Sequence, residues 1–269
     1  MNVLFWNTHK NKRINKILID LISENNVTFV CLAEYEANID HLIMGLYSKG
    51  IIMQQYPTTG CDRITILGTY MDITPGRQTK YSSFQIHNNK DIYCCIHLPS
   101  QIYSAGSGMR NVVIDTIVSD VESTEKELDS ENTVIVGDFN INPFDYGCLD
   151  ALAFHGIPIF DEANKKSRTI ASEEFKMFYN PMWCFFGDKQ KPYGTYYFSG
   201  NNTSNPFWHI YDQVIIRPSL KGRFDNSKLR IITETATRYL TDNKGHPDDD
   251  ISDHFPLVFE IKEENHGQA

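Results

Sequence analysis

The sequence predicts a sheet-rich, layered domain of the α/β (α+β) class. Its 269 residues are enough to bury a sizeable core, and 41% of them are hydrophobic, which argues against overall disorder. Continuous apolar runs, typical of strands covered on both faces, alternate with helix-like segments early in the chain and follow one another directly later. This mixed order favours a layered domain over a simple doubly wound one. Because no repeat or linker interrupts the chain, we expect one domain at 1–262 and a frayed tail at 263–269.

The first hundred residues are predicted to contain two helices among six strands. Residues 11–25 carry apolar side chains at helical spacing, which indicates an amphipathic helix with one buried stripe. That stripe consists of Ile14, Ile17, Leu18, Leu21 and Ile22. A second, short helix is expected at about 38–47. Strands are predicted at 2–7, 27–36, 51–56, 62–70, 80–87 and 90–98.

The remainder of the chain is predicted to hold one long helix and several further strands. In 108–129, Val113, Ile117 and Val121 line one helix face while acidic residues populate the other. Residues 140–193 are punctuated by four prolines and are predicted to be irregular. Within them, 155–193 is interpreted either as a substrate-facing insertion or as ordinary loop packing around aromatic side chains. Strands are predicted at 133–139, 194–198, 209–217, 229–234 and 255–261.

Composition limits the classes of function. The net charge of −9 argues against a protein that coats duplex nucleic acid through a broad basic face, although a bound metal ion can reverse the field locally. None of the six cysteines forms a CxxC pair, so reduced core thiols are expected and not a zinc knuckle. No secretory signal and no run of 18 apolar residues is present. We therefore expect a cytoplasmic protein with no membrane association and no obligate protein partner.

Polar residues recur where the predicted apolar strands begin or end. An ionised carboxylate beside a buried run costs several kcal/mol unless it is paired or bound to metal, and catalytic groups prefer such rigid rims. A set of these residues spread over the chain therefore predicts one shared cleft. The set consists of Asn7, Glu34, His97, Asp138, Asn140, Asp212, Asp253 and His254.

Each member of this set also has an ordinary structural interpretation. Asn7 suits a helix N-cap, Glu34 a solvent-facing strand end, and His97 a satisfied core histidine. Asp138 and Asn140 suit an Asx-turn. Asp212 suits a structural ion pair with Arg217 or Arg63, and Asp253 and His254 suit a cap at the entry of the last strand. The acidic run at 248–250 is interpreted as a solvated loop.

In this order, the residues resemble the endonuclease/exonuclease/phosphatase superfamily, which includes deoxyribonuclease-like and exonuclease III-like metal-dependent phosphodiesterases. The most specific segments are GDFN at 137–140 and SDHFPL at 252–257. Five weaker segments also follow the order found in the family: WN, LAE, IHLPS, GTYYF and IYDQVIIRP. One departure is Ile-Tyr-Asp at 210–212, where family members usually have Ile-Asp. The resemblance covers nearly the whole chain and implies a four-layer αββα sandwich, with two mostly antiparallel sheets flanked by helices.

The resemblance also implies a metal site. Glu34 would be the main carboxylate ligand of Mg²⁺ or Mn²⁺, both of which prefer oxygen ligands. Asn7 would be a secondary oxygen contact. Asp253 is a further candidate ligand for the same or a second ion.

Five residues are assigned to the chemistry by the same resemblance. His254 is the general-base candidate, and Asp212 would hold its ring in one tautomer and orientation. Asp138 and Asn140 would meet the attacking water and the phosphate, and whether the histidine or the aspartate is the base stays open. His97 would donate to the phosphoryl oxygen or the leaving group.

The leading hypothesis for the function is a metal-dependent phosphodiester hydrolase, in particular a nuclease that cleaves DNA or RNA. The alternative is a phosphatase or phosphodiesterase for a small molecule such as a nucleotide, inositol phosphate or lipid headgroup. A non-catalytic binding module is a third hypothesis. Arg63, Tyr103 and Arg110 are candidate substrate contacts, and each could instead sit in a surface salt bridge or a packed edge.

Overall fold

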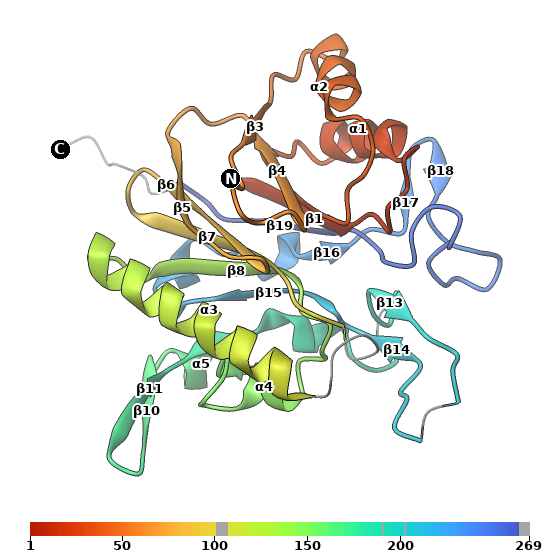
Figure 1. Cartoon of the computed structure of the whole chain (residues 1–269). Helices are drawn as coiled ribbons and strands as arrows, with labels where there is room; N and C mark the ends of the chain where they lie inside the picture. The colour runs from red at the N-terminus through yellow and green to blue at the C-terminus, as the bar shows by residue number, and fades with distance from the viewer. Residues whose placement is uncertain (101–106, 190, 202, 264–269) are drawn as a thin grey trace.

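Two large sheets lie face to face with helices on both outer sides in the computed structural model, which describes residues 1–100, 107–189, 191–201 and 203–263 (Figure 1). Helices α1 (Asn15–Glu24) and α2 (Ile39–Ser48) cover one outer face, and the long helix α3 (Ser107–Leu128) covers the other. The short helices α4 (Tyr146–Leu149) and α5 (Phe160–Ala163) lie on the α3 side. The predicted four-layer αββα arrangement is confirmed.

The first sheet has the strand order β16-β19-β1-β2-β4-β3, in which β1 and β2 are parallel and the remaining neighbours antiparallel. Its strands are β1 (Asn2–Asn7), β2 (Phe29–Ala33), β3 (Gln54–Tyr56), β4 (Ile64–Gly68), β16 (Arg230–Ile231) and β19 (Leu257–Glu260).

The second sheet has the order β5-β6-β7-β8-β15-β12-β9, with parallel pairs β7–β8 and β12–β9. Its strands are β5 (Ile73–Gln78), β6 (Ser82–His87), β7 (Asp91–His97), β8 (Asn132–Asp138), β9 (Gly156–Ile157), β12 (Phe178–Tyr179) and β15 (Asp212–Ile216). The remaining elements are β10 (Ser167–Ile170), β11 (Glu173–Lys176), β13 (Tyr196–Tyr197), β14 (Trp208–His209), β17 (Glu234–Thr235), β18 (Arg238–Tyr239), and the 3-10 helices η1 (Pro181–Phe185), η2 (Pro218–Gly222) and η3 (Asn226–Lys228).

The central strands β7 and β8 are buried on both faces, which explains their uninterrupted apolar sequences. Along β7, Tyr93 and Cys95 belong to the core between the sheets, whereas Cys94 and Ile96 pack on the α3 side. This alternation follows from the two-residue period of a strand. On that period His97 continues the inter-sheet face, so the strand delivers a polar side chain to the space between the two sheets.

The prediction that residues 140–193 are irregular is wrong, because short elements from α4 to η1 occupy much of this range. Strands of two residues carry no readable periodicity, and the β10–β11 hairpin is mostly exposed, so neither leaves an apolar pattern. Strand β5 was not predicted either, because it contains Pro75 and Gly76, which an edge strand tolerates. The first helix begins at Asn15, four residues later than predicted.

Five cysteines are buried free thiols, as expected of reduced core cysteines: Cys31, Cys61, Cys94, Cys95 and Cys148. Cys184 is exposed. Among the helices in the described parts of the chain, none is long and apolar enough to cross a membrane.

Candidate active site

The polar residues singled out in the sequence meet at one end of the sandwich. His97 and Asp138 end the parallel strands β7 and β8 and are register partners. Asp212, at the start of β15, pairs with Asp138 from the other side. From the opposite sheet, Asn7 ends β1 and donates from Nδ2 to Asp138 Oδ2 at 3.0 Å. Strand order alone therefore brings four distant parts of the chain together.

A cleft of about 1060 Å³ opens at this point. Trp6 helps to place His254 there, because its indole Nε1 donates to the His254 carbonyl at 2.8 Å. Asp212 is completely buried behind the cleft wall. The predicted residues that line the cleft are Asn7, Glu34, Arg63, His97, Asp138, Asn140, Asp253 and His254.

The GDFN segment turns tightly, and its first residue must be glycine. A Cβ on Gly137 would lie 1.9 Å from the backbone carbonyl oxygen of Ile96 on the neighbouring strand. Asp138 Oδ1 then accepts the Asn140 N–H at 2.8 Å, so the Asx-turn expected of an ordinary structural role is present. Asn140 itself has a φ of 50° and donates from its side chain to the Leu98 carbonyl at 3.0 Å. The turn uses one Asp138 oxygen and leaves Oδ2 facing the cleft.

His254 and Asp212 form a buried pair. His254 Nδ1 lies 2.7 Å from Asp212 Oδ2, and the hydroxyl of Thr195 accepts the Asp212 N–H at 3.1 Å. Burial alone would lower the pKa of His254, but the negative charges of Asp212 and Asp138 and the hydrogen bond to Asp212 raise it to about 10. The imidazole is therefore held as a cation near neutral pH.

Asp138 occupies the centre of the arrangement. Its Oδ2 lies 3.7 Å from His97 Nε2 and 4.0 Å from His254 Nε2, both too far for a direct hydrogen bond. Burial raises the pKa of Asp138 to about 7; the positive charge of His254 opposes that rise, and the negative charge of Asp212 adds to it. A carboxyl group with such a pKa exchanges a proton near neutrality.

His97 and Glu34 face each other across the cleft floor, with Nε2 and Oε1 3.7 Å apart. Burial, followed by the positive charges of Arg63 and His254, lowers the pKa of His97 to about 3, so its ring is neutral and keeps one N–H donor. Glu34 has a φ of 51°, a conformation that is uncommon for a residue with a side chain. Such backbone strain concentrates at functional sites.

Solved structures with the same architecture include an AP endonuclease from Archaeoglobus fulgidus, with a TM-score of 0.56, 11% identity, and coverage of 97% of this chain and 99% of that one. The 3′–5′ exonuclease NExo from Neisseria meningitidis matches with a TM-score of 0.58, 14% identity, and coverage of 98% and 100%. A structure of the 3′ phosphatase NExo from Neisseria bound to product DNA hairpin gives a TM-score of 0.56 with the same identity and coverage.

This chain has the endonuclease/exonuclease/phosphatase fold. The similarity extends from end to end of each neighbour, so the resemblance seen in the motifs is confirmed at the level of the fold. No protein-family model matches the sequence, and the curated proteins give no match.

The oxygen ligands that line this cleft fit a hard divalent cation. Ligand atoms of Asp138, Asp212 and His254 lie within 4.8 Å of one another, but the hydrogen bond between Asp212 and the His254 ring already occupies two of those atoms. Glu34 and Asp253 suit the ion better, because their side chains are 28% and 25% exposed and both line the cleft. Carboxylate oxygen is the ligand that Mg²⁺ and Mn²⁺ prefer.

The three candidate substrate contacts have different positions. Arg63 lines the cleft and lies over the Tyr81 ring, 4.9 Å from its centroid. Arg110 is only 3% exposed and donates to the Asn140 carbonyl at 3.2 Å, so it supports the GDFN turn from beneath. This burial disfavours direct contact of Arg110 with a substrate. Tyr103 lies outside the described residues.

Two interpretations made from the sequence are not supported by the structure. Asp212 pairs with His254 and not with an arginine, while Arg217 donates from Nε to Glu125 at 2.7 Å. Residues 155–193 do not line the cleft in the part of the chain that the structure describes, so the substrate-facing interpretation of this stretch has no support. Phe185 is buried, and Trp183 packs against Phe186, as ordinary loop packing requires.

Sequence reasoning missed several residues of the site. Thr195 was noticed only as part of a strand, yet its hydroxyl fixes the backbone at Asp212. Ser252 donates to the Asn7 carbonyl at 2.7 Å and accepts the His254 N–H at 3.1 Å. His9 lies 3.1 Å from Asp253 Oδ1. Its position two residues after Asn7 was the one available signal.

Proposed function

We propose that the chain is a divalent-metal-dependent phosphodiester hydrolase that cleaves nucleic acid. The observation that carries this proposal is the convergence of Asp138 and the Asp212–His254 pair with Glu34 in one cleft. These groups supply a proton acceptor, a fixed cation and a metal-binding carboxylate within the reach of one phosphate. The arrangement matches the roles that the motifs imply.

Asp138 is the proton acceptor in the proposed reaction. Its pKa near 7 lets the carboxylate take a proton from the attacking water as the oxygen–phosphorus bond forms. The amide of Asn7 holds Oδ2 in place during this transfer. The sequence left the base open between this aspartate and His254, and the raised pKa of His254 favours the aspartate, because a protonated ring cannot accept a proton.

His254 stabilises the negative charge that develops on the phosphoryl oxygens. Asp212 keeps the His254 ring charged and oriented, so that the Nε2–H group of His254 is available as a donor in the cleft. His97 is neutral and supplies a second N–H donor from the other side of Asp138. Asn140 holds the turn between them through its bond to Leu98.

Glu34 and Asp253 would hold the metal ion. When bound, the ion supplies Lewis-acid polarisation of a phosphate oxygen. The Asn7 Oδ1 accepts the His9 N–H at 3.1 Å and keeps a second lone pair, so Asn7 is suited only to a secondary contact. Without a cation this cleft brings together the carboxylates of Glu34, Asp138 and Asp253, which would repel a phosphate.

Two features support nucleic acid as the substrate. Lys10, Arg63 and Lys80 line the cleft and suit a phosphate backbone. The solved neighbours are described as an AP endonuclease, a 3′–5′ exonuclease and a 3′ phosphatase bound to a DNA product. The net charge of −9 and the small number of cations favour the second candidate, a small phosphate ester.

A substrate panel separates the two candidates. Purified protein is incubated with supercoiled plasmid, single-stranded DNA, RNA and bis-p-nitrophenyl phosphate, with Mg²⁺, Mn²⁺ or EDTA. We expect cleavage of at least one polymer with either ion and none with EDTA. Release from the small ester alone would support the second candidate, and an absence of metal-dependent turnover on every substrate would leave a binding module.

A further inference from the structure

Two cations share one aromatic ring in the cleft. The guanidinium carbon of Arg63 lies 4.9 Å from the centroid of the Tyr81 ring, and Lys80 Nζ lies 5.7 Å from the same centroid. All three residues line the cleft. Within the described parts of the chain, no carboxylate oxygen lies within 4.0 Å of a side-chain nitrogen of Arg63 or Lys80. Because like charges around one ring repel each other, an anion bound to both cations would relieve that repulsion.

The second sheet fixes the distance between this cation pair and the proposed proton acceptor. His97 and Asp138 are register partners at the ends of β7 and β8. The His97 N–H donates to the carbonyl of Tyr81, which precedes β6, at 3.0 Å. Tyr81, His97 and Asp138 therefore stand in a row across three neighbouring strands. Since neighbouring strands lie about 4.8 Å apart, the backbones of Tyr81 and Asp138 are about 10 Å apart.

The first sheet repeats this order across the cleft. Asn7 ends β1, and Glu34 follows the neighbouring strand β2. The Glu34 N–H donates to the carbonyl of Arg63, which precedes β4, at 3.3 Å. Arg63 is therefore two strands away from Asn7, whose side chain donates to Asp138. Both sheets thus place the contact between Arg63 and Tyr81 on the same side of Asp138, two strands away.

A single phosphate cannot reach both places. In the proposed reaction the attacked phosphate lies at Asp138 and His254, and a distance of about 10 Å exceeds the width of one phosphate group. A nucleic-acid strand can bridge this distance, because every nucleotide along it adds a phosphate. We propose that Arg63 and Lys80 form a second phosphate subsite, which holds a phosphate next to the one that is hydrolysed. The preferred substrate is then a strand with consecutive phosphodiesters and not an ester with one phosphate.

The contact with Tyr81 leaves the hydrogen-bond donors of Arg63 available. No N–H of this guanidinium donates to another group in the part of the chain that the structure describes. A guanidinium that rests on a ring can still hold a phosphate at two points, and the ring restricts its rotamers before the phosphate binds. Lys80 is exposed and supplies a point charge without a fixed geometry. Arg63 should therefore contribute more to the subsite than Lys80.

This inference rests on the proposed hydrolysis of nucleic acid, and it specifies which strands are preferred. Thymidine oligonucleotides that differ by one phosphate test it. TpT has a single phosphodiester, whereas each phosphodiester of TpTpT has a neighbouring phosphate. With Mn²⁺, the full-length wild-type protein should cleave TpTpT with a kcat/KM per phosphodiester at least about tenfold above that for TpT, because charge-assisted hydrogen bonds to a phosphate are strong.

The variants should change this ratio in a defined order. Arg63→Met keeps an unbranched apolar side chain that packs on Tyr81 but removes the charge, so the ratio should fall close to one. Arg63→Lys keeps the charge without the fork and should retain part of the preference. Lys80→Met should cause a smaller fall than Arg63→Met, and its exposed position makes misfolding an improbable cause. Circular dichroism confirms that each variant is folded.

Lys221→Met is the matched control. Lys221 also lies over an aromatic ring, with Nζ 4.2 Å from the centroid of Phe160, but neither residue lines the cleft. This variant should leave the ratio between TpTpT and TpT at the wild-type value.

The dependence on salt provides a second readout. Each phosphate contact to a single strand contributes about 0.7 to the slope of log affinity against log salt concentration. For an octathymidylate strand, the slope of log kcat/KM against log KCl concentration should therefore be smaller by about 0.7 in Arg63→Met than in the wild type. A ratio and a slope that are the same in the wild type, Arg63→Met and Lys80→Met would overturn the proposal.

Failure of the hydrolytic function itself gives a different pattern. Wild-type protein would then cleave neither TpT nor TpTpT faster with Mn²⁺ than with EDTA, and both proposals would be wrong. If the wild type cleaves both oligonucleotides with Mn²⁺ but at equal rates per phosphodiester, the hydrolase stands and the second phosphate subsite is wrong. The same conclusion follows if Arg63→Met slows cleavage of TpT and TpTpT by the same factor.

Discussion

The two ends of strands β7 and β8 both carry buried polar clusters, but the clusters differ in charge balance. At the start of these strands, Asp91 accepts from Arg223 Nη1 at 2.8 Å and from Asn132 at 3.0 Å. At the other end of the strands, Asp138 Oδ2 lies 4.0 Å from His254 Nε2. Arg223 hydrogen-bonds to both oxygens of Asp91 and matches its charge, whereas both oxygens of Asp138 accept hydrogen bonds only from the neutral groups of Asn7 and Asn140.

This contrast distinguishes a structural charge from a functional one. Arg223 joins Asp91 through both guanidinium ends, so the pair closes on itself and fastens β7 to the segment before η3. In the cleft, Asp138 and Asp253 lie 4.0 Å and 3.9 Å from the buried cation His254, and Glu34 lines the same cleft. Uncompensated buried charge is costly and persists where a ligand or a reaction uses it.

Replacement of the cleft carboxylate should have the largest effect on activity. Asp138→Asn removes the proposed proton acceptor but keeps the side-chain shape, so hydrolysis should fall by about 10³-fold or more. Stability should change by less than about 1 kcal/mol, because the loss of a hydrogen bond is offset by relief of repulsion with Asp212. Steady-state rates and urea unfolding measure the two effects. Wild-type activity in this variant would remove Asp138 from the mechanism.

Replacement of Asp91, the carboxylate that is paired with Arg223, should lower stability and leave activity unchanged. Asp91→Asn leaves the Arg223 guanidinium without its counter-charge, and breaking such a buried pair costs about 3 kcal/mol or more. The rate per folded molecule should stay at the wild-type level. Glu162→Gln is the control, because the exposed Glu162–Lys165 pair is worth only a few tenths of a kcal/mol. A stability loss no larger than that of the control would contradict the contrast between the two ends.

The lowered pKa of the Asp91 carboxyl group should also make stability depend on pH. Burial alone would raise the pKa of Asp91, but hydrogen bonds from Arg223 and His87 and the charge of Arg223 hold it well below its usual value. A carboxyl group with a lowered folded-state pKa stabilises the protein above its unfolded pKa of about 3.9 and loses that contribution as the pH falls through the folded value. Urea unfolding from pH 5 to pH 2 should therefore show a steeper loss in wild type than in Asp91→Asn. Parallel curves would contradict this assignment.

A smaller effect on activity is expected from a change at Thr195, which lies behind the cleft wall. Thr195→Val keeps the side-chain shape but removes the acceptor for the Tyr211 and Asp212 N–H groups. We expect kcat to fall by about tenfold with little change in KM, because an unpaired buried N–H costs about 1–2 kcal/mol and shifts Asp212 under the His254 ring. Thr116→Val, at an exposed hydroxyl on α3, should leave kcat unchanged. An equal change in both variants would remove Thr195 from the site.

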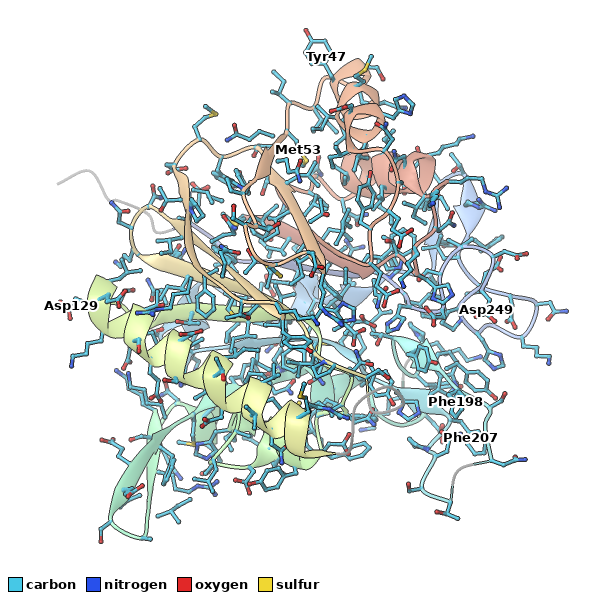
Figure 2. The ribbon with its side chains drawn as sticks, viewed as in Figure 1. Tyr47, Met53, Asp129, Phe198, Phe207 and Asp249 are labelled. Carbon is cyan, nitrogen blue, oxygen red and sulfur yellow. The ribbon has the colours of Figure 1, made fainter. Side chains whose placement is uncertain are left out.

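Much of the fold and of the site could be predicted, because their signals are local in the sequence. Long buried strands leave uninterrupted apolar runs, and the polar residues that end them stand out against those runs. Asp138 and His254 were found in this way, within segments that also resemble a family. The interpretation of residues 248–250 as a solvated loop agrees with the structure at Asp249 and Asp250, which are exposed, whereas Asp248 is half-buried; Asp249 lies on an outer loop (Figure 2).

Some parts could not be predicted, because contacts between distant segments create them. His9 looks like an ordinary loop residue until a left-handed turn brings it to Asp253, at the far end of the chain. Thr195 matters only because its segment lies against the start of β15. The exposed rings of Phe198 and Phe207 on the same side of the molecule are a further case, since their sequence suggests burial (Figure 2).

The most direct test of the site is the initial rate of hydrolysis by Glu34→Gln and His254→Ala, on the best substrate of the panel with saturating Mn²⁺. Both proteins should fold as the wild type does and should hydrolyse the substrate at least about 10²-fold more slowly, since each loses a group that we propose to contact the phosphate or its metal ion. Wild-type rates in both variants would show that the polar residues gathered at this end of the sandwich do not form an active site.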